Sequence, residues 1–161
     1  MTDAAQQHLA LDVLNHPHIE FLILADRAEA INGKLYLMGG AWDRTFVQDF
    51  GQPVPLSFAL SVQVPWVATN QPHTIEITIE DLDRRQSVDF EMRAEFVAGR
   101  PAWARVGQPQ RVILTIPGAA VMLKEPGEYQ IVAKINGGET ESRVAFHAVP
   151  AHTQPPPQAG R

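Results

Sequence analysis

The sequence predicts an all-β fold, a single eight-stranded antiparallel β-sandwich with a short N-terminal helix or extension. Its length of 161 residues corresponds to one domain of ordinary size. Hydrophobic residues make up 45% of the chain, which is enough for a buried core. Between Ile19 and Val149, short apolar runs are separated by Gly, Pro, Asn and Asp, a pattern typical of many short strands joined by turns. This pattern leaves little room for helices.

The two ends of the chain differ in composition from the middle. Residues 1–18 form an extension in which Ala4–Leu14 has apolar residues at helical spacing, and Pro17 disfavours helix just before it. Residues 150–161 are rich in Pro and poor in apolar side chains, so we expect a disordered tail. The β-sandwich domain is therefore predicted to span residues 19–149.

The first three predicted strands follow the extension. Glu20–Ala25 and Lys34–Gly39 are expected to pair, because Asn32-Gly33 between them is the dipeptide that best fits a two-residue hairpin turn. Leu56–Trp66 alternates apolar residues with small or polar ones along its whole length. This alternation indicates a strand with one face buried.

The next three strands include a charged hairpin. Thr74–Glu80 and Val88–Phe96 both alternate, and the polar residues 83–86 provide a turn between them. From Glu76 to Glu95 there are seven acidic and three basic residues, so the outer face of this hairpin is strongly negative. Such a face can be solvated and prevent edge-to-edge pairing, or it can meet a basic partner or a divalent cation. Arg111–Ile116 is the sixth strand.

The last two strands carry the most specific local pattern. Glu128–Asn136 and Thr140–Val149 are joined by Gly137 and Gly138, which suit a tight turn. Residues 125–129, which read E-P-G-E-Y, resemble the tyrosine corner of immunoglobulin-like (Ig-like) sandwiches, in which the Tyr hydroxyl bonds the upstream backbone. An Ig-like sandwich is therefore favoured, and a jelly roll with the same number of strands is the alternative.

Residues 32–43 form a second recognisable pattern, N-G-K-L-Y-L-M-G-G-A-W-D. Together with Phe21–Asp26, this stretch resembles the opening of a bacterial family of small uncharacterised proteins, a domain of unknown function with the pattern N-G-K-L-Y-x-x-G-G-x-W-D. The resemblance supports the boundaries of the predicted domain. It implies no activity, substrate or cofactor.

Composition argues against several classes of function. Thirteen Lys and Arg against 18 Asp and Glu give a formal charge of −5, which disfavours a nucleic-acid partner. The chain has no Cys, so disulfides, thiolate metal sites and cysteine nucleophiles are excluded. The first residues lack the pattern of a signal peptide, and no uncharged apolar stretch is long enough to cross a membrane. We therefore expect a cytoplasmic protein with no membrane partner.

The candidate catalytic and metal-binding residues do not converge on a site. His16 and His18 beside Glu20 could hold a metal ion from one side, but no third ligand is identifiable. Asp26 and Asp43 flank one hairpin and could form an acid–base pair, although a role in turns explains them more simply. Motifs of nucleophile elbows, zinc proteases, P-loops and dinucleotide sites are absent. We therefore predict no catalytic residue, no metal and no cofactor.

Two segments could form a contact surface. Arg100, Trp103 and Arg105 fall in the connection after the fifth strand, and Trp and Arg are the residue types most enriched at binding hot spots. Trp42, followed by Asp43, comes after Gly39-Gly40 and could either fill the end of the sandwich or serve as a platform for a ligand.

These observations predict a non-catalytic binding or assembly module that acts through protein–protein contacts at its sheet edges and at Trp103, as a homo-oligomer. The alternative is a sandwich that binds a sugar or an anion on Trp42, Trp66 or Trp103. A hydrolase or metal enzyme is disfavoured, because no set of His, Asp or Ser residues converges.

Overall fold

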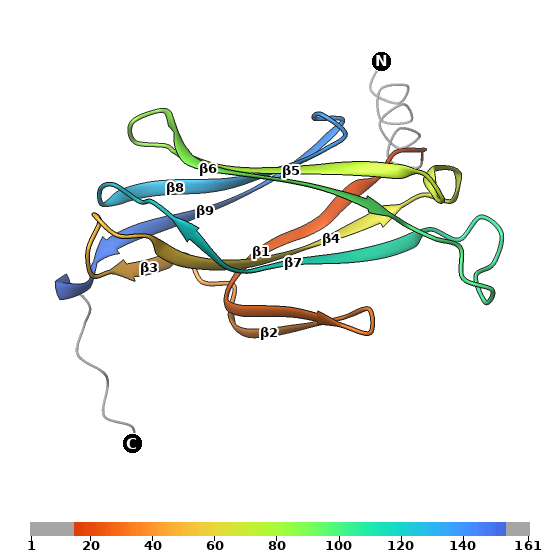
Figure 1. The fold of residues 1–161 in the computed structure, drawn as a ribbon, viewed down its shortest axis with the longest axis horizontal. Coiled ribbons are helices and arrows are strands. Elements are labelled where there is room, and N and C mark those ends of the chain that lie inside the picture. Colours follow the sequence, from red (N-terminus) through yellow and green to blue (C-terminus); the bar gives the residue numbers. More distant parts are fainter. Residues whose placement is uncertain (1–14, 154–161) are drawn as a thin grey trace, which may run out of the picture.

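A computed structural model of the chain describes residues 15–153, and over this range nine strands form two sheets packed face to face (Figure 1). The strands are β1 (His18–Ile31), β2 (Lys34–Gly40), β3 (Arg44–Val47), β4 (Val54–Val64), β5 (Pro72–Asp81), β6 (Gln86–Val97), β7 (Gln110–Val121), β8 (Gly127–Ile135) and β9 (Thr140–Pro150). Short 3-10 turns, η1 (Trp66–Ala68) and η2 (Ala151–Thr153), follow β4 and β9. The helix predicted at Ala4–Leu14 lies outside the described residues, as does most of the predicted tail.

One sheet has the strand order β2-β1-β4-β7, and the other has the order β3-β9-β8-β5-β6. All eight predicted strands are present, but the expected number of eight is wrong, because β3 adds a ninth. β3 has only four residues and pairs in parallel with β9, about a hundred residues away along the chain. A strand this short shows no periodicity of its own, and its partner is too distant for a local pattern to reveal. The other strand pairs are antiparallel.

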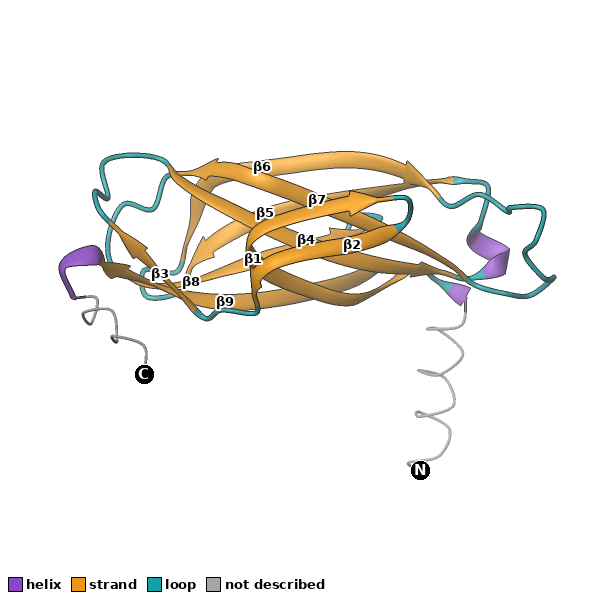
Figure 2. Ribbon diagram, turned by 90° about the horizontal axis from the view of Figure 1, so that it is seen from below, coloured by secondary structure: helices purple, strands orange, loops and turns teal. Residues whose placement is uncertain are grey.

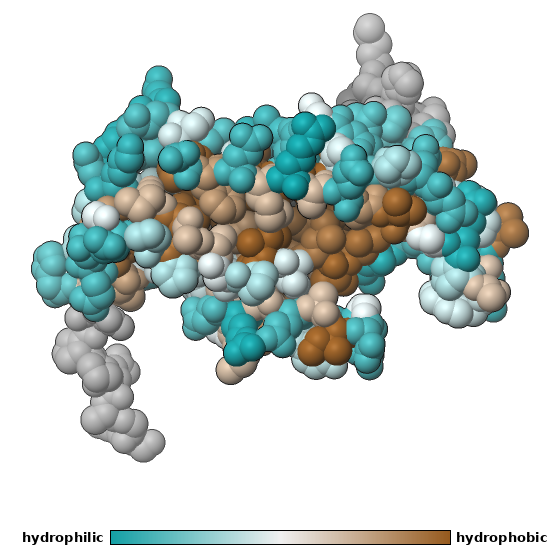
Figure 3. All heavy atoms as spheres, in the orientation of Figure 1, coloured by the Kyte–Doolittle hydropathy of each residue, from teal (hydrophilic) through white to brown (hydrophobic). Residues whose placement is uncertain are grey.

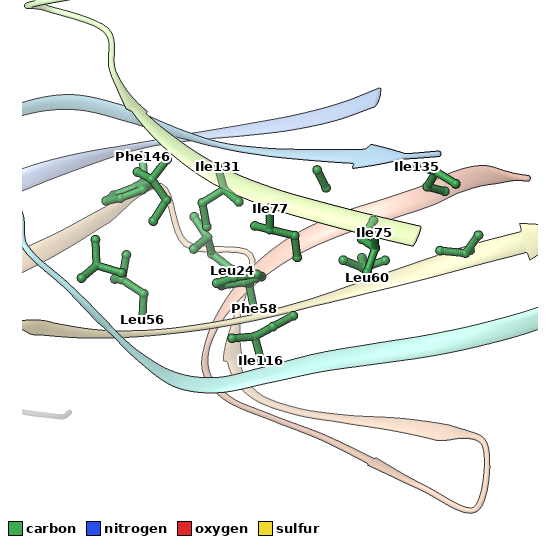
Figure 4. Close-up of a cluster of buried hydrophobic side chains, with 14 of the residues drawn as sticks. Leu24, Leu56, Phe58, Leu60, Ile75, Ile77, Ile116, Ile131, Ile135 and Phe146 are labelled. Carbon is green, nitrogen blue, oxygen red and sulfur yellow. The ribbon is translucent and has the colours of Figure 1, made fainter. Parts of the chain in front are cut away.

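The core lies between the sheets and follows the predicted alternation on β5. On β5, Ile75, Ile77 and Ile79 are fully buried, whereas the residues between them are only half-buried. Figure 4 shows Ile75 and Ile77 meeting side chains of the opposite sheet, such as Leu24, Phe58 and Leu60. β4, which was predicted to bury one face, is instead buried on both from Leu56 to Val62, because it lies between β1 and β7 and its outer-face residues are small. Where β6 and β7 form the sheet edges, partly buried hydrophobic side chains follow the gap between the sheets and are visible from outside (Figure 3). The two sheets thus share one core.

The predicted tyrosine-corner hydrogen bond is confirmed. The hydroxyl of the buried Tyr129 donates to the backbone oxygen of Glu125 at 2.6 Å. The β5–β6 turn packs on the same corner: the backbone N–H of Leu82 donates to the oxygen of Glu128 at 2.9 Å, and the N–H of Glu128 donates to Oδ2 of Asp83 at 2.9 Å. Burial raises the pKa of Tyr129, so the phenol stays a donor. This network ties the β5–β6 hairpin to the start of β8.

The β1–β2 hairpin projects from the body of the sandwich, below the four-stranded sheet in Figure 1 and in front of it in Figure 2. Asn32 and Gly33 both have positive φ, 51° and 72°, which makes the predicted turn type I′. β1 runs on to Ile31, six residues beyond its predicted end. That extension reads D-R-A-E-A-I, in which charged residues and Ala hide the strand pattern.

Candidate contact surface

Seven of the eight large exposed hydrophobic side chains on the described part of the chain gather in two places, and the eighth, Phe21, lies apart on β1. One group, which we call the loop end, consists of Val67, Val97, Trp103 and Val106. The other group lies on the β1–β2 hairpin and consists of Ile31, Tyr36 and Met38. Single exposed hydrophobics are normal, whereas clusters of them mark contact sites.

The loop end is built from η1, the last residue of β6 and the β6–β7 loop, residues 98–109. Figure 2 shows η1 beside this loop at one end of the molecule, and the N–H of Asn70 donates to the oxygen of Ala98 at 2.8 Å. Within the loop, two turns close with hydrogen bonds from Ala104 to Pro101 at 2.9 Å and from Gln108 to Arg105 at 3.0 Å. The Trp103 side chain is 74% exposed and that of Val106 is 88% exposed.

Arg100 fastens the start of this loop to η1. Its guanidinium carbon lies 4.2 Å from the ring centroid of Trp66, a cation–π contact. Its Nη2 donates to the backbone oxygen of Trp66 at 2.8 Å, and its Nε donates to Oγ1 of Thr69 at 2.5 Å. Arg100 therefore stacks on Trp66 and leaves the Trp103 ring exposed. The pairing joins residues 34 positions apart, so nothing in the local sequence indicated it.

Arg105 lies in the second turn of the loop. Its backbone N–H donates to Oε1 of the Gln108 side chain at 3.2 Å, and the residue is exposed. The two arginines thus have different environments: Arg100 holds the loop, and Arg105 reaches solvent beside Trp103. The guanidinium of Arg100 is directed to Trp66 and Thr69.

Trp42 and Asp43 belong to the other end of the sandwich, next to β3 (Figure 1). The Trp42 ring is partly buried and packs edge-on against Phe146, with centroids 6.1 Å apart, and Phe146 stacks in turn on Tyr129 at 5.8 Å. Asp43 is exposed and accepts from Nε of Arg44 at 3.0 Å. This ion pair lowers the pKa of Asp43. Trp42 therefore fills the sandwich end, far from Trp103.

Glu20 is the carboxylate that the sequence placed beside the two histidines. It accepts hydrogen bonds from Nε and Nη2 of Arg111 at 2.5 and 2.6 Å and from Oγ of Ser61 at 2.6 Å. The Arg111 hydrogen bond is the main reason why the pKa of Glu20 falls to about 2. His16 lies 3.7 Å from Glu139, at Oε2. Among residues 15–153, no group of three His, Asp or Glu side chains is placed to hold a metal ion.

The acidic hairpin is partly neutralised by ion pairs within its own sheet. Glu76 pairs with Arg93 at 3.3 Å, and Glu80 pairs with Arg143 at 3.2 Å while accepting from the Gln130 side chain at 2.6 Å. Asp26, which the sequence suggested as a partner for Asp43, lies against Gly39, where a Cβ would collide with its carboxylate. Asp26 and Asp43 therefore have different neighbours. The turn role expected for both is wrong for Asp26, which lies within β1, whereas Asp43 lies in the bend before β3.

Comparison with known proteins gives a family and no function. Over the described residues, no helix is long and apolar enough to cross a membrane. No curated protein matches the chain. A family model, described as a family of unknown function (DUF6941), matches residues 20–148, which is most of the predicted domain. The chain therefore belongs to the DUF6941 family.

Proposed function

We propose that this chain is a non-catalytic module that assembles with other protein chains, itself included, through the loop end. One observation carries the proposal: four large hydrophobic side chains, those of Val67, Val97, Trp103 and Val106, are exposed together at one end of the sandwich. Exposing them to water costs free energy that a partner surface would recover, at about 25 cal/mol per Å² of apolar area. Trp is also the residue type most enriched at hot spots.

The base of the loop end supports this role. Arg100 is held by a cation–π contact and two hydrogen bonds, so the loop leaves the sandwich in a defined direction. A partner that binds a surface held in this way loses less conformational entropy on binding than one that must order a free loop. A preorganised base with an exposed aromatic tip is the arrangement expected of a contact loop.

Other roles have less support. The small-ligand alternative needs tryptophans with open faces, but Trp42 packs against Phe146 and Trp66 carries Arg100, which leaves Trp103 alone with an exposed ring. Two of the predicted acid–base and metal candidates, Asp43 and Glu20, are engaged by Arg and Ser side chains, which supports a module without catalysis. The tyrosine corner supports an Ig-like sandwich. The formal charge of −5 supports partners other than nucleic acids, and we place the protein in the bacterial cytoplasm.

The test is the solution mass of the full chain, measured by light scattering over a concentration series. We expect wild type to exceed the single-chain mass of 17.8 kDa, and we expect Trp103→Ala to lower the average mass at each concentration. Phe21→Ala, which truncates an aromatic ring on β1 that is 38% exposed, is the matched control and should not lower it. Circular dichroism checks that each variant is folded. If Trp103→Ala has the same mass as wild type, the loop end is not the contact surface.

A further inference from the structure

The two sheets have four edge strands, and three of them carry features that oppose pairing with another chain. Charged or inwardly bent edges, prolines, bulges and very short strands are the usual means of preventing edge-to-edge association. β3 has only four residues. β7 is broken by a register shift opposite Leu56–Phe58, at Pro117-Gly118. β6 has a register shift opposite Ile79 and exposes four charged side chains, those of Asp89, Glu91, Arg93 and Glu95.

β2, the remaining edge, lacks these features beyond its first residue, Lys34. From Leu35 to Gly40 it contains no charge and no proline, and its register with β1 is unbroken from Lys34 to Met38. Tyr36 and Met38 are 52% and 67% exposed on one face, whereas Leu35 and Leu37 are half-buried on the other. An uncharged edge on a projecting hairpin is the geometry that accepts another strand.

The register shows which backbone groups face the free edge. In a two-residue hairpin, the residues that flank the turn form a hydrogen-bonded pair, and such pairs alternate along an antiparallel ladder. Ile31 and Lys34 flank the turn, so Lys34, Tyr36 and Met38 direct their backbone groups towards β1. Leu35 and Leu37 therefore direct theirs to the free edge.

We propose that a second copy of the chain pairs with this edge, β2 against β2, antiparallel about a twofold axis at Tyr36. The two four-stranded sheets then form one continuous eight-stranded sheet. Leu35 of each copy lies opposite Leu37 of the other, and these are the residues whose backbone groups are free to bond. The two Tyr36 rings meet as a non-hydrogen-bonded pair, the pair type in which side chains are closest.

Charge allows this pairing. Lys34 is the one charged residue of β2, and in this register it lies opposite Met38 of the other copy. The two Lys34 positions are four residues apart along the strands, or roughly 14 Å at about 3.4 Å per residue. That exceeds the Debye length of about 8 Å at physiological ionic strength, so their repulsion is screened. The edge is therefore complementary to itself.

This inference rests on the proposed assembly role and adds a second contact to it. A pairing of five residues buries less than the roughly 800 Å² per partner of a standard stable interface, so the β2 contact dissociates on dilution. Because the β2 contact and the loop end are separate surfaces, the β2 contact can be isolated in chains that carry Trp103→Ala.

The experiment measures the solution mass of the full chain with Trp103→Ala, from about 1 μM to about 1 mM, a range that covers weak complexes. We expect the mass to rise towards twice 17.8 kDa as concentration increases. Adding Tyr36→Lys should hold the mass at one chain throughout, because two lysines would meet at the axis. In the monomer the new lysine lies opposite Glu29, so the hairpin is retained. Gln52→Lys, in the exposed loop before β4, adds the same charge elsewhere and should have no effect.

Hydrogen exchange gives a second readout on the same samples. The amides of Leu35 and Leu37 should exchange more slowly at high concentration than at low concentration, and Tyr36→Lys should remove the difference. If Trp103→Ala chains stay at single-chain mass throughout, the β2 contact is overturned, and the proposal that the loop end is a contact surface is unaffected. A dimer that persists after Tyr36→Lys, with both amides unprotected, would also overturn it. Equal masses for wild type and Trp103→Ala would instead count against the loop end alone.

Discussion

At the scale of single residues, several polar side chains have partners that the sequence did not indicate. Glu20 was expected beside a histidine pair, yet it binds Arg111, 91 positions away. Arg100 was expected beside Trp103, yet it stacks on Trp66. Each partner comes from a different strand or turn, so the pairing depends on the fold and not on local spacing. Tyr129 is the exception, because its acceptor, the oxygen of Glu125, lies four residues before it.

Glu20 makes the stability of the protein depend on pH. Its pKa is lowered from 4.5 to about 2 in the folded state, chiefly by the Arg111 hydrogen bond. A depressed pKa adds stability above the unfolded value, and this stability is lost as pH falls from about 4.5 towards 2. We predict that Glu20→Gln lowers the free energy of unfolding at pH 7 by about 1–3 kcal/mol. This range lies below the full energy equivalent of the pKa shift, because the solvent around Arg111 screens the ion pair. Urea titrations at several pH values measure this effect.

The comparison with wild type tests the cause. The difference between wild type and Glu20→Gln should shrink between pH 4.5 and about 2, where the wild-type carboxylate takes up its proton. Glu95→Gln removes an exposed carboxylate from β6 and serves as the control, with a change within about 0.5 kcal/mol. If the difference between wild type and Glu20→Gln is constant over this pH range, the ion pair with Arg111 is not its source.

At the scale of elements, the β1–β2 hairpin depends on two glycines for different reasons. Gly33 needs positive φ for the turn, and a Cβ there would meet nothing within 4 Å. Gly39 also has positive φ, 57°, and a Cβ there would collide with the Asp26 carboxylate. We predict that Gly33→Ala destabilises the protein by about 1 kcal/mol and Gly39→Ala by about 2–4 kcal/mol, measured by urea unfolding.

A double variant separates the two costs at Gly39. Asp26→Ala removes the colliding carboxylate but leaves the positive φ, so Asp26→Ala with Gly39→Ala should recover part of the loss. The same Asp26 change combined with Gly33→Ala should recover nothing. Additive effects in the first pair would mean that the carboxylate moves away at little cost.

Most strands could be predicted from local sequence signals. β5 and β6, for example, alternate over many residues, and the Asn32-Gly33 turn indicated the pairing of the first two strands. β3 was missed because it is too short, and the end of β1 was missed because that segment is rich in Ala and charged residues. For the contact surface, the sequence singled out Trp103 but could not show that Val67 and Val97, on other elements, are exposed at the same end.

At the scale of the whole molecule, both sheets contribute to one core, and this predicts cooperative unfolding. The core joins residues from the strands of both sheets without a division between its two ends. Trp42 packs on Phe146 at one end, and Trp66 carries Arg100 at the other, so each reports on a different part of the sandwich. Chains that retain a single tryptophan, made with Trp→Phe changes at the other two positions, allow the two ends to be followed separately.

We predict that the two fluorescence reporters and far-ultraviolet circular dichroism give one common midpoint in urea. A shared core makes the loss of either end expose apolar surface of the other, so partly unfolded forms are disfavoured. Each single-tryptophan chain must first show the same midpoint by circular dichroism, because Trp42→Phe removes part of the packing on Phe146. Should the Trp66 signal change at lower urea than the Trp42 signal, the loop end would open independently. The loop end would then be a surface that a partner must order on binding, at a cost in affinity.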